Sequence, residues 1–157
     1  MIKQFRLTES AWRVFWIVAS VAVAVLIFYF SSQIAAESNE LSKGFLRKLL
    51  TLLLGRSPDT LPRRYNHYIR KAAHFLIYAL LGFCLTGVFL HQKRLPAIPT
   101  AIAVAALYAM TDEFHQSFVP GRGPQITDVL LDTSGAALGA SIMGLLLLLL
   151  RKTRKTA

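Results

Sequence analysis

Four apolar segments of membrane-spanning length dominate this sequence and leave it few folds to adopt. They cover residues 13–33, 69–90, 96–117 and 127–150, each close to the ~20 residues that an α-helix needs to cross a bilayer. Backbone groups inside a bilayer must be hydrogen-bonded within the protein, so such segments predict helices. The 157 residues are 54% hydrophobic with a mean hydropathy of +0.47, too apolar for an ordinary soluble domain. We predict an all-α integral membrane protein, a four-transmembrane-helix bundle folded as a single domain over residues 1–157.

The positive charge is distributed as in membrane proteins rather than as in nucleic-acid-binding proteins. The net charge is +10, but the lysines and arginines gather at the ends of the apolar segments instead of along one polar face. We therefore expect membrane lipids, and no nucleic acid, as partners. The single Cys84 lies inside an apolar segment, so an intrachain disulfide is excluded.

The first apolar segment admits two interpretations. Ala35 and Ala36 follow it and would suit cleavage of a signal peptide. Trp12, Trp16 and Tyr29 instead suit anchoring at the membrane interface. Because the apolar run exceeds the core of about 7–15 residues found in signal peptides, a retained anchor is favoured.

Residues 41–54 combine leucines with Lys43, Arg47 and Lys48, which cluster on one side of a helix. This stretch is too short and too charged to cross a bilayer, so it predicts an amphipathic helix lying in the interface between the first and second spans. A buried re-entrant segment is the alternative. Short polar stretches separate the last three spans, which is typical of antiparallel neighbours.

The orientation of the bundle follows less directly from the charges. The 18 lysines and arginines divide evenly between the two sides of the membrane. Arg70, Lys71 and Arg122 lie beside acidic residues, so we interpret them as functional residues and leave them out of the count. The remaining positive charges are more numerous on the side of the two termini, which favours cytoplasmic N- and C-termini. We therefore expect a multi-pass protein whose polar helix ends face the extracytoplasmic side.

Polar residues gather at the ends of the spans that this alternating topology places on one face of the membrane. Ionisable groups at such depths are costly and mark a functional site by default. These residues are Ser31, Ser32 and Gln33 after the first span, Arg70, Lys71 and His74 in the second, Asp112 to Gln116 in the third, Arg122 in the next loop, and Thr127, Asp128 and Asp132 in the fourth.

Helical spacing directs many of these groups to common faces, because residues three or four apart lie on one side of a helix. Asp112, His115 and Gln116 share a face, and so do Asp128 and Asp132, which continue into Gly135 and Gly139. The glycine pair predicts close approach of a neighbouring helix. We expect an acid of the third span to contact His74 or a nearby cation.

The charges at these helix ends oppose the helix dipoles. Acids near the end of the third span, and Arg70 and Lys71 near the start of the second, are each unfavourable by about 0.3–1 kcal/mol. Mutual neutralisation across the bundle would account for both. A buried ion-pair network that fixes helix register is the structural alternative, although such pairs stabilise poorly in a low dielectric.

Four sequence blocks, in order, resemble the VanZ-like family of small bacterial membrane proteins: FSSQ, RKAAHFLIYALLG, YAMTDEFHQSFVPGRG and DVLLDTSGAALG. The resemblance implies a protein of the bacterial cytoplasmic membrane and cell envelope, and the family takes its name from a protein associated with low-level teicoplanin resistance. Its characteristic positions would be Gln33, Lys71, His74, Tyr78, Asp112, Glu113, Gln116, Arg122, Asp128 and Gly135. Asp132 occupies a position that we associate with Asn or Asp in the family, which makes its charge a weaker expectation.

The chemistry of these residues suits an anionic headgroup. Neighbouring carboxylates in a poorly solvated site resist joint ionisation, which favours a retained proton on one of them. We predict Asp112 or Glu113 as the base or nucleophile and His74 as the acid. The predicted substrate-binding residues are Arg122, Lys71, Arg70, Gln116, His115, Gln33, Tyr78 and Asp128. The expected substrate is an anionic lipid or a lipid-linked or phosphate-bearing cell-wall precursor.

Three functions remain open at this stage. The first is an enzyme, a hydrolase or transferase acting on an envelope lipid headgroup. The second is a module that binds such a headgroup or precursor without chemistry. The third is a proton-coupled carrier. It ranks last because four spans leave little room for alternating access and the sequence shows no repeat with interrupted helices.

Metal dependence is only weakly indicated by the sequence. Asp112 and His115 are spaced as in one half of a carboxylate–histidine site, and His74 would add a ligand. However, the sequence has no HExxH motif, and hydrogen-bonded core histidines explain the pattern equally simply. We therefore predict no metal and no other cofactor.

Overall fold

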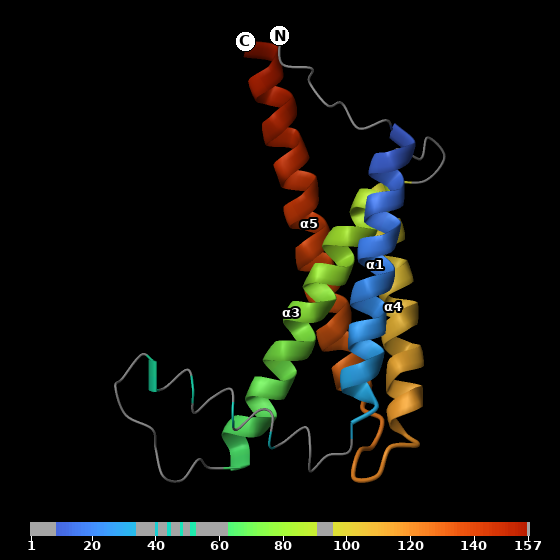
Figure 1. Ribbon diagram of the computed structural model, residues 1–157, viewed down its shortest axis with the longest axis vertical. Helices are drawn as coiled ribbons and strands as arrows, with labels where there is room; N and C mark the ends of the chain where they lie inside the picture. Colours follow the sequence, from blue (N-terminus) through green and yellow to red (C-terminus); the bar gives the residue numbers. More distant parts are fainter. Residues whose placement is uncertain are drawn as a thin grey trace.

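A computed structural model describes residues 9–33, 40, 44, 48, 51–52, 63–90 and 96–156. Within them the chain forms four helices and no strand: α1 (Glu9–Ser31), α3 (Arg63–Phe89), α4 (Ala97–Gln116) and α5 (Ile126–Thr156). Successive helices run in opposite directions, so that α1 and α4 end where α3 and α5 begin (Figure 1). The all-α prediction is confirmed for this part of the chain. The predicted interfacial helix over 41–54 and the connection at 91–94 lie largely outside the described residues.

Three of the helices are long and apolar enough to cross a membrane: Ser10–Ser31, His67–Phe89 and Ile126–Leu150. The chain is therefore a multi-pass membrane protein. The fourth predicted span corresponds to α4, whose last two turns carry Asp112 and Glu113 and which is not among these three. That α4 also crosses the membrane stays a prediction.

The ends of α3 and α5 differ from the predicted spans. α3 begins at Arg63 rather than near residue 69, and α5 continues past residue 150 to Thr156. Consequently Arg70 and Lys71 lie beyond the first turn of α3, where the dipole effect has largely decayed. The expectation that these two cations oppose the dipole of their helix is wrong for this reason.

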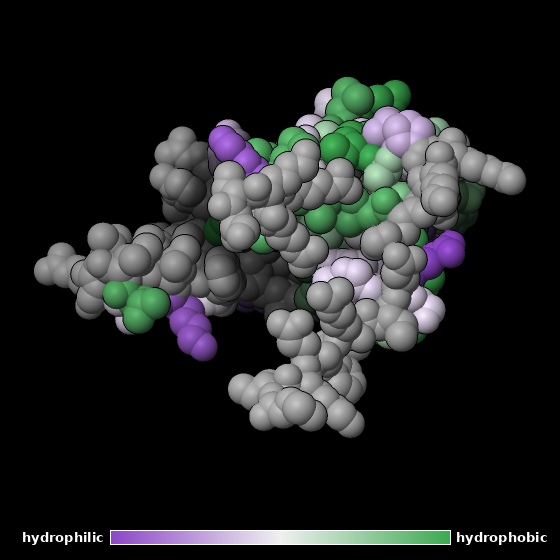
Figure 2. Space-filling model, turned by 90° about the horizontal axis from the view of Figure 1, so that it is seen from above, coloured by the Kyte–Doolittle hydropathy of each residue, from purple (hydrophilic) through white to green (hydrophobic). Residues whose placement is uncertain are grey.

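Alanines make up much of the interior of the bundle beside a few large side chains such as Tyr78 and Ile27, while many other large apolar side chains face outward. Ala101, Ala105 and Ala109 line the fully buried face of α4, and Ala136 and Ala140 do the same on α5. Hydrophobic side chains such as Val21, Leu107 and Leu148 are exposed, and such side chains make up much of the coloured outer surface seen along the long axis (Figure 2). This distribution suits a protein surrounded by lipid, where association of helices depends on close packing of small residues.

Three glycines set the spacing between α3 and α5, the most extensively packed helix pair: Gly82 of α3, against the backbone of Ala136, and Gly135 and Gly139 of α5. A Cβ atom on Gly135 would collide with the backbone carbonyl of Phe75, and one on Gly139 with that of Ala79. Only glycine allows the two backbones to approach this closely. The predicted close contact at the Gly135–Gly139 pair is thus present, and its partner is α3.

Candidate functional site

Polar side chains from all four helices come together at one end of the bundle. It is the end at which α1 and α4 end and α3 and α5 begin (Figure 1). Ser31 comes from the last turn of α1, and Asp112 and Gln116 come from the last two turns of α4. His74 lies on α3, and Asp132 lies in the second turn of α5. Four of these five side chains, all except His74, are nearly inaccessible to solvent, with exposed fractions of 0–6%. We call them, together with Tyr78, the polar cluster.

The Asp112 carboxylate is held from one side only. Its Oδ2 accepts hydrogen bonds from Ser31 Oγ at 2.9 Å and from Gln116 Nε2 at 3.2 Å, and Gln116 Nε2 also donates to Ser31 Oγ at 3.3 Å. The other oxygen, Oδ1, is buried and has no hydrogen-bond partner among the described residues. Side chains of α1 and α4 thus fix Oδ2, whereas Oδ1 is buried and free to accept a hydrogen bond or bind a ligand.

His74 and Asp132 bring α3 and α5 into the same cluster. Nδ1 of His74 lies 3.5 Å from Asp132 Oδ2, and the His74 side chain is 19% exposed. A ring nitrogen of His74 and one oxygen each of Asp112 and Asp132 all lie within 4.8 Å of one another. This meeting depends on the close α3–α5 contact, because Asp132 is a short side chain one turn before Gly135.

Tyr78 closes the buried side of the cluster. It lies one turn beyond His74 on α3, is fully buried, and is close enough to Asp112 and Asp132 to experience both charges. Nevertheless, its hydroxyl forms no well-aligned hydrogen bond, and neither oxygen of Asp132 accepts a well-aligned hydrogen bond from the described residues, although His74 Nδ1 lies 3.5 Å from Oδ2. Buried polar groups are normally hydrogen-bonded, so the polar cluster is unusually poor in partners.

Glu113 supports the loop between α4 and α5 rather than the cluster itself. Its Oε2 accepts the backbone N–H of Gln125 at 2.8 Å, and the side chain is buried. The loop turns at Gly121, whose φ of 77° is a left-handed conformation that favours glycine. Glu113 therefore fixes the segment that carries Arg122.

Arg122 reaches from this loop to the end of α1. Its Nη1 and Nη2 donate to the carbonyl oxygens of Ser31 and Phe30 at 3.3 and 3.4 Å, where a cation is favoured by the helix dipole. Burial, and then the nearby charge of Arg70, lower the pKa of the Arg122 guanidinium. Its Nε is buried and unpartnered, and none of the described carboxylates lies within ion-pair distance. Arg122 therefore places positive charge beside the polar cluster without a direct ion-pair partner among the described residues.

Comparison with known protein families gives a clear assignment. A family described as VanZ/LLP1 matches residues 15–149, a range that contains the whole polar cluster, all of α3 and α4, and most of α1 and α5. The chain belongs to the VanZ/LLP1 family. Comparisons with curated proteins and with solved structures gave no match. Family membership thus confirms the resemblance seen in the sequence, and it leaves the substrate and the reaction of this VanZ/LLP1 protein to be inferred from its site.

The remaining predicted site residues lie around the cluster, outside its centre. Lys71 Nζ pairs with Asp128 Oδ1 at 2.7 Å, with 27% and 20% of these side chains exposed. His115 stacks on Phe28 with ring centroids 4.6 Å apart, and its Nε2 lies 3.2 Å from Ser32 Oγ. Gln33 follows α1, where its backbone N–H donates to Phe30 at 3.4 Å.

One expected contact is replaced by another. We expected an acid of the third span to touch His74 or a nearby cation, yet the acid beside His74 is Asp132 of α5, and Lys71 pairs with Asp128, also of α5. The reason is the glycine contact, which brings α3 nearer to α5 than to α4. Asp132 is thus a residue of the site, although it was not among the predicted catalytic or substrate-binding residues. Its spacing from Asp128 and Gly135 was the signal that pointed to it.

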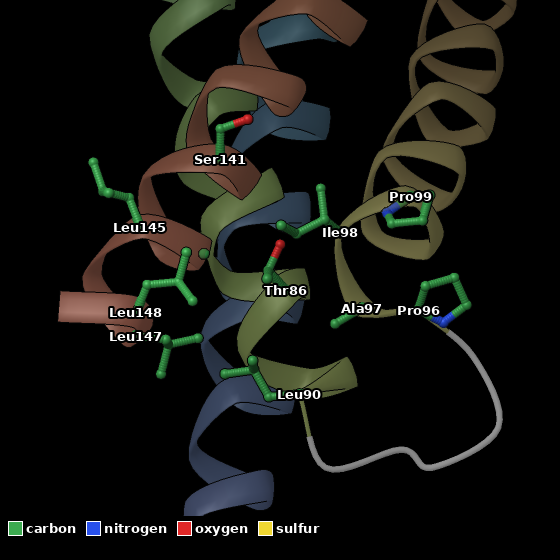
Figure 3. A pocket seen from close by; sticks show the side chains of 11 residues that line it. Thr86, Leu90, Pro96, Ala97, Ile98, Pro99, Ser141, Leu145, Leu147 and Leu148 are labelled. Carbon is green, nitrogen blue, oxygen red and sulfur yellow. The ribbon is translucent and has the colours of Figure 1, made fainter. Parts of the chain in front are cut away.

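A groove of different character lies at the opposite end of the bundle. Its volume is about 520 Å³, and Figure 3 shows apolar side chains of α3, α4 and α5 around it. Leu90, Ile98 and Leu145 are typical of the lining, and Thr86 uses its hydroxyl within its own helix by donating to Gly82. None of the described residues that line the groove is charged, so this lining suits hydrocarbon chains rather than chemistry.

Proposed function

We propose that this VanZ/LLP1 protein binds the anionic headgroup of an envelope lipid or lipid-linked wall precursor at the polar cluster and carries out acid–base chemistry on it. The observation that carries the proposal is the pair of buried carboxylates, Asp112 and Asp132, with unpartnered oxygens beside His74. Buried acids without partners are unfavourable for folding alone. Such an arrangement is instead typical of sites whose partner is a substrate.

The cations beside the cluster support an anionic ligand. Arg122 and Arg70 are close enough to repel each other, and Arg122 lacks an acidic partner in the described part of the chain. Arginine is the side chain best suited to bind phosphate and carboxylate groups through paired hydrogen bonds. A bound phosphate or carboxylate would relieve the repulsion between the two guanidinium groups. Its position would leave the rest of a lipid directed along the bundle.

The acid–base roles follow from the hydrogen bonds of each group. Asp112 Oδ2 is fixed by Ser31 and Gln116, which leaves Oδ1 as the base that accepts a proton from an attacking water or hydroxyl group. His74, oriented by Asp132, is placed to return a proton to the leaving oxygen. We assign Glu113 to positioning, because it holds the loop that carries Arg122.

Binding without chemistry is the second candidate. It is favoured by the contacts that Arg122 and Glu113 make with the backbone, since these contacts shape the site but do not activate a nucleophile. In this case the cluster would hold a headgroup or precursor, and Asp112 would act only as a hydrogen-bond acceptor.

Lipidomics of four strains distinguishes the two functions. The strains carry a deletion, Asp112→Asn, Arg122→Gln, or the control Arg13→Gln, which changes an exposed cation on α1. An enzyme predicts the same accumulated lipid in the deletion and Asp112→Asn strains and a wild-type profile for Arg13→Gln. Unchanged lipid profiles in every strain, together with loss of labelled lipid binding in Arg122→Gln, would support the binding module. Teicoplanin susceptibility measured on these strains tests the link suggested by the family name.

We further propose that α4 crosses the membrane as a fourth span and that the polar cluster faces the extracytoplasmic side. α4 buries its alanine face and exposes Val104, Leu107, Met110 and Phe114, as a lipid-facing helix does. In a Cys84→Ala background, single cysteines at Arg122 and Lys152 should react with a membrane-impermeant maleimide from opposite sides. Labelling of both from one side would overturn the four-span topology.

A further inference from the structure

We propose that His74, Asp112 and Asp132 form a binding site for one divalent first-row transition-metal ion, with Zn²⁺ as the best fit. These residues come from three different helices, and each offers one ligand atom within 4.8 Å of the other two. Tetrahedral coordination at bond lengths near 2.1 Å separates ligand atoms by about 3.4 Å. Small side-chain rotations would bring the three ligand atoms to that separation. The inference does not rest on the substrate proposed above, because metal binding is measured without substrate. In the metal-loaded site Asp112 and His74 would serve as ligands in place of the acid–base roles assigned to them above.

Charge balance favours a divalent cation at this position. Asp112 and Asp132 are 4% and 0% exposed, so two negative charges would lie close together with little solvent. Neither Lys71, which pairs with Asp128, nor Arg122, which donates to the end of α1, forms an ion pair with these two acids. A neutral imidazole, two carboxylates and one M²⁺ ion together carry no net charge. That neutral sum removes the cost of isolated buried charges.

The unpartnered atoms provide an independent indication of a missing ligand. Asp112 Oδ1, both oxygens of Asp132 and the hydroxyl of Tyr78 are all buried and without hydrogen-bond partners among the described residues. A metal ion would take one oxygen from each carboxylate. Tyr78, which lies beside both acids, would then donate its O–H to a carboxylate oxygen left free. Such second hydrogen bonds to coordinating carboxylates are a regular feature of metal sites.

The donor set narrows the class of metal. Imidazole nitrogen is a common ligand of Zn²⁺ and other transition metals, whereas Mg²⁺ and Ca²⁺ take mainly oxygen ligands. Three protein ligands leave one coordination position open, as in catalytic rather than structural zinc sites. A headgroup oxygen or a water molecule would occupy that position. The 19% exposure of the His74 side chain marks the accessible side of the cluster.

The test measures metal uptake by the full-length protein in lipid nanodiscs after removal of any histidine tag and treatment with a chelator. We expect about one Zn²⁺ per chain by mass spectrometry of the metal. We also expect Co²⁺ to give the visible absorption bands of a tetrahedral site. His74→Gln and Asp132→Asn should each weaken Zn²⁺ binding at least about tenfold, the lower end of what loss of a supporting group costs.

Matched controls come from the same surroundings. His115→Gln and His67→Gln each remove another histidine at this end of the bundle without touching the three proposed ligands. Both variants should keep wild-type affinity within about twofold. If the ligand variants fail to fold, the wild-type protein alone still tests the proposal. Zn²⁺ should raise the melting temperature of the wild-type protein in a saturable way.

Two results would overturn the proposal. One is the absence of saturable Zn²⁺ or Co²⁺ uptake by folded wild-type protein, which would identify the cluster as carboxylates sharing protons. The other is equal loss of binding in His115→Gln and His74→Gln, which would show surface binding of the metal. Either result leaves the headgroup proposal standing, because lipid binding through Arg122 is measured separately.

Discussion

The two ends of the bundle are built from the same helices α3, α4 and α5, yet they differ in both spacing and polarity. At the end that carries the polar cluster, glycines hold α3 against α5, and short acidic side chains reach His74. Toward the other end α5 diverges from α1 and α4 (Figure 1), and large apolar side chains line a groove of about 520 Å³. Close backbones permit short polar side chains to meet, whereas separated backbones leave space that lipid chains can fill.

The largest expected effect comes from breaking the close contact itself. Gly139→Val places a side chain against the backbone carbonyl of Ala79, which cannot move aside, and should cost at least about 3 kcal/mol or prevent folding. The control is Gly144→Ala near the groove, where the added methyl meets only Ile98 Cδ1 at 2.7 Å. That flexible side-chain end can shift, so we expect a loss below about 1 kcal/mol. Thermal unfolding in detergent measures both, and equal losses would contradict the proposed difference between the ends.

The next effect separates function from folding. Asp112→Asn and Arg122→Gln should abolish the envelope phenotype while each variant remains monodisperse. Asp112→Asn should be about as stable as wild type, because the variant removes a buried charge that forms no ion pair and whose Oδ1 has no hydrogen-bond partner among the described residues. A purely structural network would instead lose about 3–5 kcal/mol in each variant. Leu145→Ala in the groove serves as the control that should preserve the phenotype. Unfolding of both polar variants would argue against a substrate site.

The sequence predicts the parts of this comparison that depend on local pattern. The apolar runs locate the helices, alternating topology gathers Ser31, His74, Asp112 and Asp128 at one end, and helical spacing pairs Gly135 with Gly139. What local pattern leaves open is the register between helices that are distant in sequence. That register decides that Asp132 lies beside His74.

The loop residues show the same limit. Glu113 is adjacent to Asp112 in sequence, and spacing alone treats the two as an acid pair. In the folded chain Glu113 instead accepts the N–H of Gln125, and Arg122 binds the carbonyl end of α1. Both contacts depend on the path of the loop after Gly121, which has no periodic signature in the sequence.

A pair of serines gives a smaller test of the two ends. Ser31 is fully buried and donates to Asp112, so Ser31→Ala should cost about 1–3 kcal/mol by removing a partner from a buried carboxylate. Ser141 lines the groove and donates only to the carbonyl of Ala137 in its own helix. Ser141→Ala should therefore change stability by less than about 0.5 kcal/mol. Unfolding free energies compare the two, and a larger loss for Ser141→Ala would reverse our ranking of the ends.

The smallest effect concerns the Lys71–Asp128 ion pair at the rim of the polar end. The atoms lie 2.7 Å apart, but 27% and 20% of the side chains are exposed, so solvent weakens the attraction. We expect a coupling energy of about 1 kcal/mol or less from a double-mutant cycle with Lys71→Met and Asp128→Asn. Coupling should fall further in high salt, as exposed pairs do. A value near 3 kcal/mol that is insensitive to salt would place this pair inside the desolvated site and extend the polar cluster outward. A small coupling energy that falls in high salt would show that the Lys71–Asp128 pair is solvated. The desolvated part of the site would then consist of His74, Asp112 and Asp132.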